Sequence, residues 1–176
     1  MTKKQRKIFY PTIFFLGAIL MVWQIKIYRN TIIDLVIPIG IILIIAIIAF
    51  IIDFKNYKAT YNYSGFGLFL YSIMHYIIGF GFIFCSVFML TNYYLADKTV
   101  KTESFKIIDR TWIQGGGTKY HYGEKLPVFT INYKGKEKEL VFFAQDFDKM
   151  NFYNTVDFET RKGFFGFDIL ENKKLN

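Results

Sequence analysis

The chain has 176 residues, 53% of them hydrophobic, and a formal net charge of +8. Only two of the 14 acidic residues, Asp34 and Asp53, precede residue 97. The lone cysteine, Cys85, excludes a disulfide framework, and the interleaved charges after residue 96 argue against a nucleic-acid-binding patch. The composition therefore predicts a membrane-embedded part, residues 1–96, and an extramembrane part, residues 97–176, with the lipid bilayer as a partner and no nucleic acid.

Three long apolar segments are predicted to cross the membrane as helices, at residues 8–25, 31–52 and 66–95. At about 1.5 Å of rise per residue, even the shortest reaches about 27 Å, which is enough for the apolar core of a bilayer. The first segment also has the basic start and apolar middle of a signal peptide. No small-residue cleavage pattern follows it, however, and the next apolar segment begins a few residues later. We therefore expect three membrane-spanning helices.

Basic residues beside the three segments predict their orientation. Four lie in the amino-terminal tail and two, Lys55 and Lys58, follow the second segment, whereas only Lys26 and Arg29 lie between the first and second segments. Because basic residues are enriched on the cytoplasmic side, we expect a cytoplasmic amino terminus and an extracytoplasmic carboxy-terminal domain of a multi-pass protein of the cell (inner) membrane.

Beyond residue 96 the pattern changes to the alternation of half-buried strands. Large apolar residues occupy every second position in residues 128–133, and Lys134 and Gly135 then provide a turn to a partner strand at 139–143. Further strands are expected at 104–112, 155–159 and 164–170, with a short helix at 146–153 that begins at Asp146. The fold class is therefore α+β, in which three transmembrane helices precede an antiparallel β-domain of about five strands and one short helix, as a small sheet or partly closed barrel.

Small residues recur every seven positions in the third apolar segment, at Gly65, Ser72, Gly79 and Ser86. Small side chains let helix backbones approach closely in a membrane, so this stripe predicts helix packing or a subunit interface. His75 flanks the stripe near the middle of the segment. An ionisable side chain at that depth is a candidate for function, such as a proton relay, but no second titratable group is expected at the same depth. The alternative is a neutral, hydrogen-bonded histidine that only packs.

Other residues in the apolar segments carry weaker signals. Asp34 is expected about three residues inside the second helix, where its charge can reach water. Pro38 and Gly40 interrupt the same segment, and they are typical either of a tolerated kink or of the broken helices that line some transporter sites.

The candidate partner contact in the second half of the chain is a glycine-rich loop at Gly115, Gly116 and Gly117, followed by Tyr120, His121 and Tyr122. The spacing differs from that of a phosphate-binding loop, and a strand rather than a helix is expected after it. Asp146 and Asp148 begin like a calcium loop but lack its glycine, and the two histidines are too far apart in sequence for a zinc site. We expect no cofactor, no metal and no catalytic residues.

Three classes of function are compatible with these features. The first is a non-enzymatic accessory or assembly subunit of a bacterial cell-envelope complex, in contact with other membrane proteins or as a homo-oligomer, with the β-domain as a protein-interaction module. The second is a membrane immunity or stress factor. The third is an oligomeric transport component or membrane enzyme that uses His75.

Overall fold

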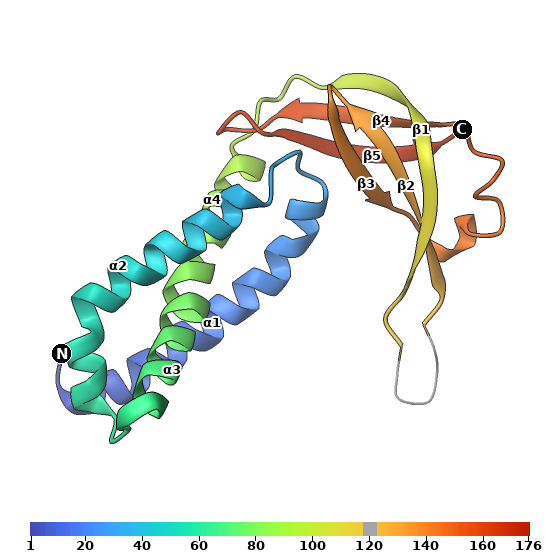
Figure 1. Ribbon diagram of the computed structural model, residues 1–176. Coiled ribbons are helices and arrows are strands. Elements are labelled where there is room, and N and C mark those ends of the chain that lie inside the picture. The colour runs from blue at the N-terminus through green and yellow to red at the C-terminus, as the bar shows by residue number, and fades with distance from the viewer. Residues whose placement is uncertain (118–122) are drawn as a thin grey trace. The chain divides into compact units, whose positions relative to one another are not determined.

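The computed structural model describes residues 1–117 and 123–176 and divides them into two compact units (Figure 1). The helical unit comprises Met1–Ala96 together with Gly163–Phe167, and the β unit comprises Asp97–Lys162 together with Asp168–Asn176. Two of the three boundaries between the units therefore lie at the two ends of one short turn, Gly163–Phe167. This turn belongs with the helices although it connects two strands.

Three helices of the helical unit are long and apolar enough to cross a membrane, as the sequence predicts. They are α1 (Lys3–Arg29), α2 (Val36–Thr60) and a third, continuous span, Gly65–Tyr94. The third span consists of α3 (Gly65–His75), the π-helix η1 (Tyr76–Gly81) and α4 (Phe82–Tyr94). Its η1 and α4 parts contact both α1 and α2, whereas α3 packs mainly against α2, and α1 and α2 contact each other little.

The ends of the first two helices differ from the predicted boundaries for local reasons. A capping box begins α1 earlier than expected, because Thr2 and Gln5 each accept a hydrogen bond from the other's backbone amide. The helix then runs to Arg29, so the link to α2 consists of Asn30–Leu35 rather than residues 26–30. Asp34 consequently lies before α2, where its carboxylate accepts a hydrogen bond of 3.1 Å from the Val36 amide, and not inside the helix.

Close backbone contacts surround the π-helix η1. A Cβ atom at Gly17 of α1 would collide with the Ile78 carbonyl oxygen, and one at Gly81 would lie 2.9 Å from the Ile42 carbonyl oxygen of α2. Both contacts would be far closer than an ordinary van der Waals contact, so only glycine fits at positions 17 and 81. A π-helix has a wider turn than an α-helix and occurs frequently at functional sites.

The β unit is an antiparallel sheet of five strands in the order β3-β2-β1-β4-β5, among the residues that the structure describes. The strands are β1 (Lys101–Gln114), β2 (Lys125–Tyr133), β3 (Lys136–Val141), β4 (Thr155–Lys162) and β5 (Asp168–Leu175). The long strand β1 pairs first with β4 and then with β2, and the register shifts between Ile107 and Asp109 where the partner changes. This central strand therefore joins two hairpins into one sheet.

The sheet is strongly curved. The Tyr133 hydroxyl of β2 donates a 2.9 Å hydrogen bond to Asp168 of β5, although two strands separate them in the sheet. On the inner face the rings of Phe105 and Phe158 stack with centroids 5.0 Å apart, and Ile131 and Ile169 are fully buried. Side chains therefore fill the space between the two ends of the curved sheet. In the described part of the chain, the edge strands β3 and β5 are not paired with each other.

The segment between β3 and β4 packs against Phe129, which lies on the same face of β2 as Ile131. Phe129 is fully buried because the rings of Phe142 and Tyr153 pack against it, at 5.4 and 6.1 Å between centroids. Arg110 of β1 holds the segment in place by donating hydrogen bonds to the backbone oxygens of Met150 and Tyr153. The expected helix at 146–153 is wrong, since the regular structure in this segment is a single 3-10 turn, η2 (Ala144–Asp146).

The last strand begins later than the sequence predicts. The alternation of residues 164–170 favours a strand there, but β5 starts at Asp168, and Gly163–Phe167 forms a turn in the helical unit. The reason is tertiary, because Asn92 of α4 binds the backbone of this turn. Its Oδ1 accepts from the Phe165 amide at 3.0 Å, and its Nδ2 donates to the Phe167 oxygen at 3.2 Å.

Candidate functional site

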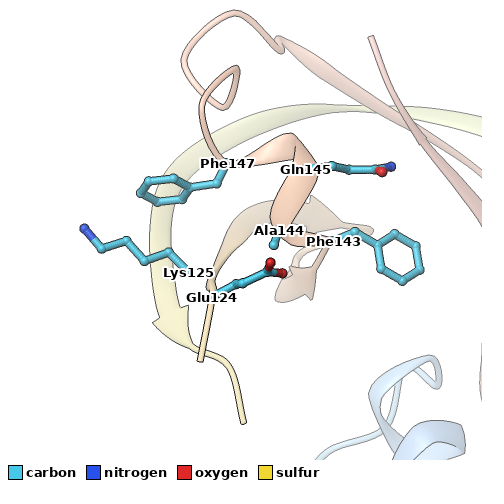
Figure 2. Close-up of a pocket in the computed structure, with 6 residues that line it drawn as sticks. All are labelled: Glu124, Lys125, Phe143, Ala144, Gln145 and Phe147. Carbon is cyan, nitrogen blue, oxygen red and sulfur yellow. The ribbon is translucent and has the colours of Figure 1, made fainter. Parts of the chain in front are cut away.

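An open pocket of 640 Å³ lies in the β unit, where the β1–β2 hairpin meets the segment after β3 (Figure 2). Its lining combines aromatic, aliphatic and charged side chains: Glu124, Lys125, Phe143, Ala144, Gln145 and Phe147. Two of these residues come from the start of β2 and its approach, and four come from the turn around η2. The pocket therefore depends on tertiary packing between segments about 20 residues apart in the chain.

Lys125 is held over two aromatic rings at the edge of this pocket. Its ammonium lies 4.6 Å from the centroid of Trp112 and 5.3 Å from that of Phe147, and the two rings meet edge to face. The sheet register explains the first contact, because Trp112 opposes Pro127 and Lys125 is its diagonal neighbour on the paired strand. Cation–π contacts of this kind fix a long side chain and keep its charge at the surface.

Large apolar side chains around the pocket are exposed to solvent. Phe143 is 76% exposed and Trp112 is 45% exposed. Exposed phenylalanines contribute nothing to the core, and clusters of exposed aromatic residues mark protein-interaction surfaces. We call these two residues, together with Lys125 and Phe147, the aromatic surface.

The predicted partner loop lies next to the aromatic surface. Gly115 ends the paired part of the hairpin, where its amide donates a 2.8 Å hydrogen bond to the Glu124 oxygen. Gly116 and Gly117 are exposed. Tyr120, His121 and Tyr122 lie outside the described residues. The three glycines do not line the pocket, and Phe143 and Phe147, which do line it, were not recognised from the sequence.

The helical unit contains a second polar cluster, centred on the Asp53 carboxylate. Oδ2 accepts hydrogen bonds from the hydroxyls of Tyr10 at 2.8 Å and Tyr76 at 3.2 Å, and Oδ1 accepts one from Asn56 at 2.9 Å. All three membrane-span helices contribute to it, since Tyr10 lies on α1, Asp53 and Asn56 on α2, and Tyr76 at the start of η1. Charge-assisted hydrogen bonds at one carboxylate therefore connect the whole bundle.

His75 lies beside the Asp53 cluster. Its ring centroid is 5.1 Å from that of Tyr10 and 5.2 Å from those of Tyr57 and Tyr76, and its Nε2 atom is buried without a hydrogen-bond partner. The expectation that no titratable group shares its depth is wrong, because Tyr10 and Tyr76 both contact the imidazole and bind Asp53.

The small residues of the third span take different positions. Ser72, Gly79 and Ser86 are buried, and a Cβ atom at Gly79 would lie 2.9 Å from Ile13 of α1. Gly65 is exposed with a positive φ of 58° and has open space around its Cβ position, so it takes no part in helix packing. Its role is to begin α3 in a conformation that favours glycine.

Pro38 does not break the second helix. It lies in the first turn of α2, where a missing amide hydrogen costs nothing because those amides have no partner within the helix. Gly40 follows it with open space around its Cβ position. A broken-helix site of the kind found in transporters is therefore not formed at these two residues.

A charged pocket of 450 Å³ on the β unit has its ionic groups paired with one another. Lys134 lies 2.9 Å from the Tyr133 hydroxyl and 3.6 and 3.7 Å from carboxylate oxygens of Asp168 and Glu103. The hydrogen bond to Tyr133 is the main reason why the pKa of Lys134 is raised above its ordinary value. Within the described part of the chain, no group of three or more His, Cys, Asp or Glu side chains could hold a metal ion.

The chain was compared with protein-family models, with curated proteins and with solved structures. No protein-family model, no curated protein and no solved structure matches the chain. Inference about function therefore rests on the aromatic surface and on the Asp53 cluster.

Proposed function

We propose that this protein is a non-enzymatic accessory or assembly subunit of a bacterial cell-envelope complex, anchored by its three helices and binding a partner protein through the β unit. The observation that carries the proposal is the aromatic surface, on which Phe143 is 76% and Trp112 45% exposed. Burying one such side chain at an interface contributes about 1.5–3 kcal/mol, which is enough for a binding hot spot.

The composition of the aromatic surface favours a protein partner over a small molecule. Protein interfaces are enriched in aromatic residues at the centre and have polar groups at the rim. Here Trp112, Phe143 and Phe147 provide the centre, and Glu124 and Lys125 provide charges at the border of the pocket. A small-molecule site is more enclosed, whereas this pocket is open to solvent.

The cell (inner) membrane is the proposed location, with a cytoplasmic amino terminus and an extracytoplasmic β unit. The three apolar helices and the distribution of basic residues support this placement. Six basic residues flank one side of the spans, against four on the other: Lys26, Arg29, Lys98 and Lys101. A reporter fused after Asn176 that is active only outside the cytoplasm should be active. Activity of a strictly cytoplasmic reporter at that position would contradict the proposed orientation.

Native purification in mild detergent tests the partner. The intact protein should co-purify with another membrane or envelope protein in a fixed stoichiometry, and Phe143→Ser should weaken this association by roughly 10- to 100-fold. Ile108→Ser is the matched control, because Ile108 is also an exposed apolar residue of the β unit, at 50%, but lies at the register shift of β1 and does not line the pocket.

The pattern across the two variants decides the outcome. Loss of the partner with Phe143→Ser and its retention with Ile108→Ser would support the aromatic surface as the binding site. A monomer without a companion protein, or equal loss in both variants, would contradict the proposal.

A second candidate function is proton-linked transport by an oligomer, which the Asp53 cluster favours. Asp53, Tyr10 and Tyr76 form a hydrogen-bonded set against a buried imidazole, and such groups mark proton relays in membrane proteins. This function predicts that His75→Ala abolishes transport in proteoliposomes while the thermal unfolding of the protein is retained. If transport is absent in the wild type as well, this candidate is eliminated.

A further inference from the structure

An apolar groove of 290 Å³ lies in the helical unit between α2 and the third span. Four residues of α2 at helical spacing, Leu43, Ala46, Ile47 and Phe50, form one wall, and Phe69 and Tyr76 are on the other. The floor is buried, with Ala46 6% and Tyr76 1% exposed, whereas the rim residues Ile47 and Phe69 are 58% and 51% exposed. The groove therefore opens outward from the bundle.

The groove offers no hydrogen-bonding group to an occupant. Its one polar lining residue is Tyr76, whose hydroxyl already donates to Asp53. A groove of this volume is too narrow for a whole helix, which is about 10 Å across with its side chains, and its wall from Leu43 to Phe50 is about 10 Å long. One extended hydrocarbon chain lying along α2 matches both its shape and its polarity.

One end of the groove carries positive charge, which favours lipids with an anionic headgroup. The end of α2 and the amino-terminal part of α1 lie together, because Tyr10 and Asp53 are hydrogen-bonded. Six basic residues lie in these segments: Lys3, Lys4, Arg6, Lys7, Lys55 and Lys58. The only acidic residue there is Asp53, whose oxygens are already bound by Tyr10, Tyr76 and Asn56. The net positive field at this end is complementary to an anionic headgroup.

We propose that this groove binds one anionic phospholipid, with an acyl chain between α2 and the third span and its phosphate at the basic end near Lys58. The distance is suitable, since Lys58 lies eight residues beyond Phe50, or about 12 Å along the helix, and a lysine side chain can extend along the helix surface. This inference rests on the proposed membrane placement but not on the partner-binding role of the aromatic surface.

Native mass spectrometry of the full-length protein in detergent, titrated with phosphatidylglycerol or phosphatidylcholine, tests the site. The wild type should bind one phosphatidylglycerol with higher affinity than phosphatidylcholine. Ala46→Phe fills the floor of the groove and should weaken binding of both lipids by at least about 10-fold, the effect of excluding roughly two methylene groups from the groove. Ile48→Phe is the matched control, because this half-exposed residue points away from the groove on the same helix.

Removal of a charge provides a second, independent readout that does not change the groove. Lys58→Gln should weaken the preference for phosphatidylglycerol and leave phosphatidylcholine binding unchanged. Equal binding by Ala46→Phe and wild type, an unchanged lipid preference in the lysine variant, or a dimer that forms in place of the lipid complex would each overturn the proposal. A protein that is soluble without detergent and binds neither lipid would instead contradict the membrane placement itself.

Discussion

Replacement of Asn92 by leucine should release the turn Gly163–Phe167 from α4. Asn92 is fully buried, and its side chain makes two hydrogen bonds, to the Phe165 amide at 3.0 Å and the Phe167 oxygen at 3.2 Å. Leucine has a similar size but offers neither partner. Each lost hydrogen bond costs about 1 kcal/mol, and more when its partner stays buried, so the expected destabilisation is about 2–4 kcal/mol.

Hydrogen exchange separates this effect from general unfolding. The Phe165 amide depends on the Asn92 side chain, whereas the Phe164 amide donates to the Asn92 main-chain oxygen at 3.1 Å and keeps its partner in the variant. Exchange of Phe165 should therefore accelerate by roughly 10-fold or more relative to Phe164, as a loss above about 1.4 kcal/mol requires. Tyr94→Leu, at an exposed position of the same helix, is the control and should leave both amides protected. Unchanged protection of Phe165 in the Asn92→Leu protein would refute the reasoning.

Three further variants test other parts of the structure. Asp53→Ala leaves the buried hydroxyls of Tyr10 and Tyr76 without an acceptor and should lower the free energy of unfolding in detergent by about 2–4 kcal/mol. In a protein that already carries Tyr10→Phe and Tyr76→Phe, Asp53→Ala should lower this free energy by less than half as much. An equal loss in the two backgrounds would contradict the hydrogen-bonding explanation. Gly17→Val places a side chain against the Ile78 carbonyl oxygen and should destabilise the bundle by at least about 2 kcal/mol, measured by thermal unfolding. Burial, and secondarily repulsion by a neighbouring lysine, lowers the pKa of Lys138 from 10.5 to about 8. Between these two pH values the unfolded chain binds more protons than the folded chain, so the free energy of unfolding should rise with pH there. Lys138→Met should remove this rise. It should also stabilise the protein at pH 7 by about 1–2 kcal/mol, measured by denaturant unfolding, after allowance for solvent screening.

The sequence predicts those parts of the fold that depend on one segment at a time. Continuous apolar stretches identify all three spans, and the alternation in residues 128–133 identifies β2, because helix length and strand period are local properties. The late start of β5 could not be found in this way. Residues 164–167 have the pattern of a strand, and only the hydrogen bonds from Asn92, 73 residues or more earlier, make them a turn.

The candidate sites show the same limit. His75 can be recognised as a buried ionisable residue, but its neighbour Asp53 appears in the sequence as a charge at the end of another helix. Their proximity depends on how α1, α2 and η1 pack, and the π-helix itself has no sequence pattern that we recognised. Likewise, the glycine-rich loop at 115–117 is a visible feature, whereas Phe143 acquires significance only through its exposure and its place at the pocket.

The turn Gly163–Phe167 also constrains the order in which the protein can be completed during synthesis. Because this turn belongs to the helical unit, the buried amide of Asn92 finds its partners only after β1 to β4 have been translated. The helical unit therefore reaches its final form late, after nearly the whole chain has been translated. A gene cut after residue 96 would yield three helices with an unsatisfied polar side chain at the end of α4.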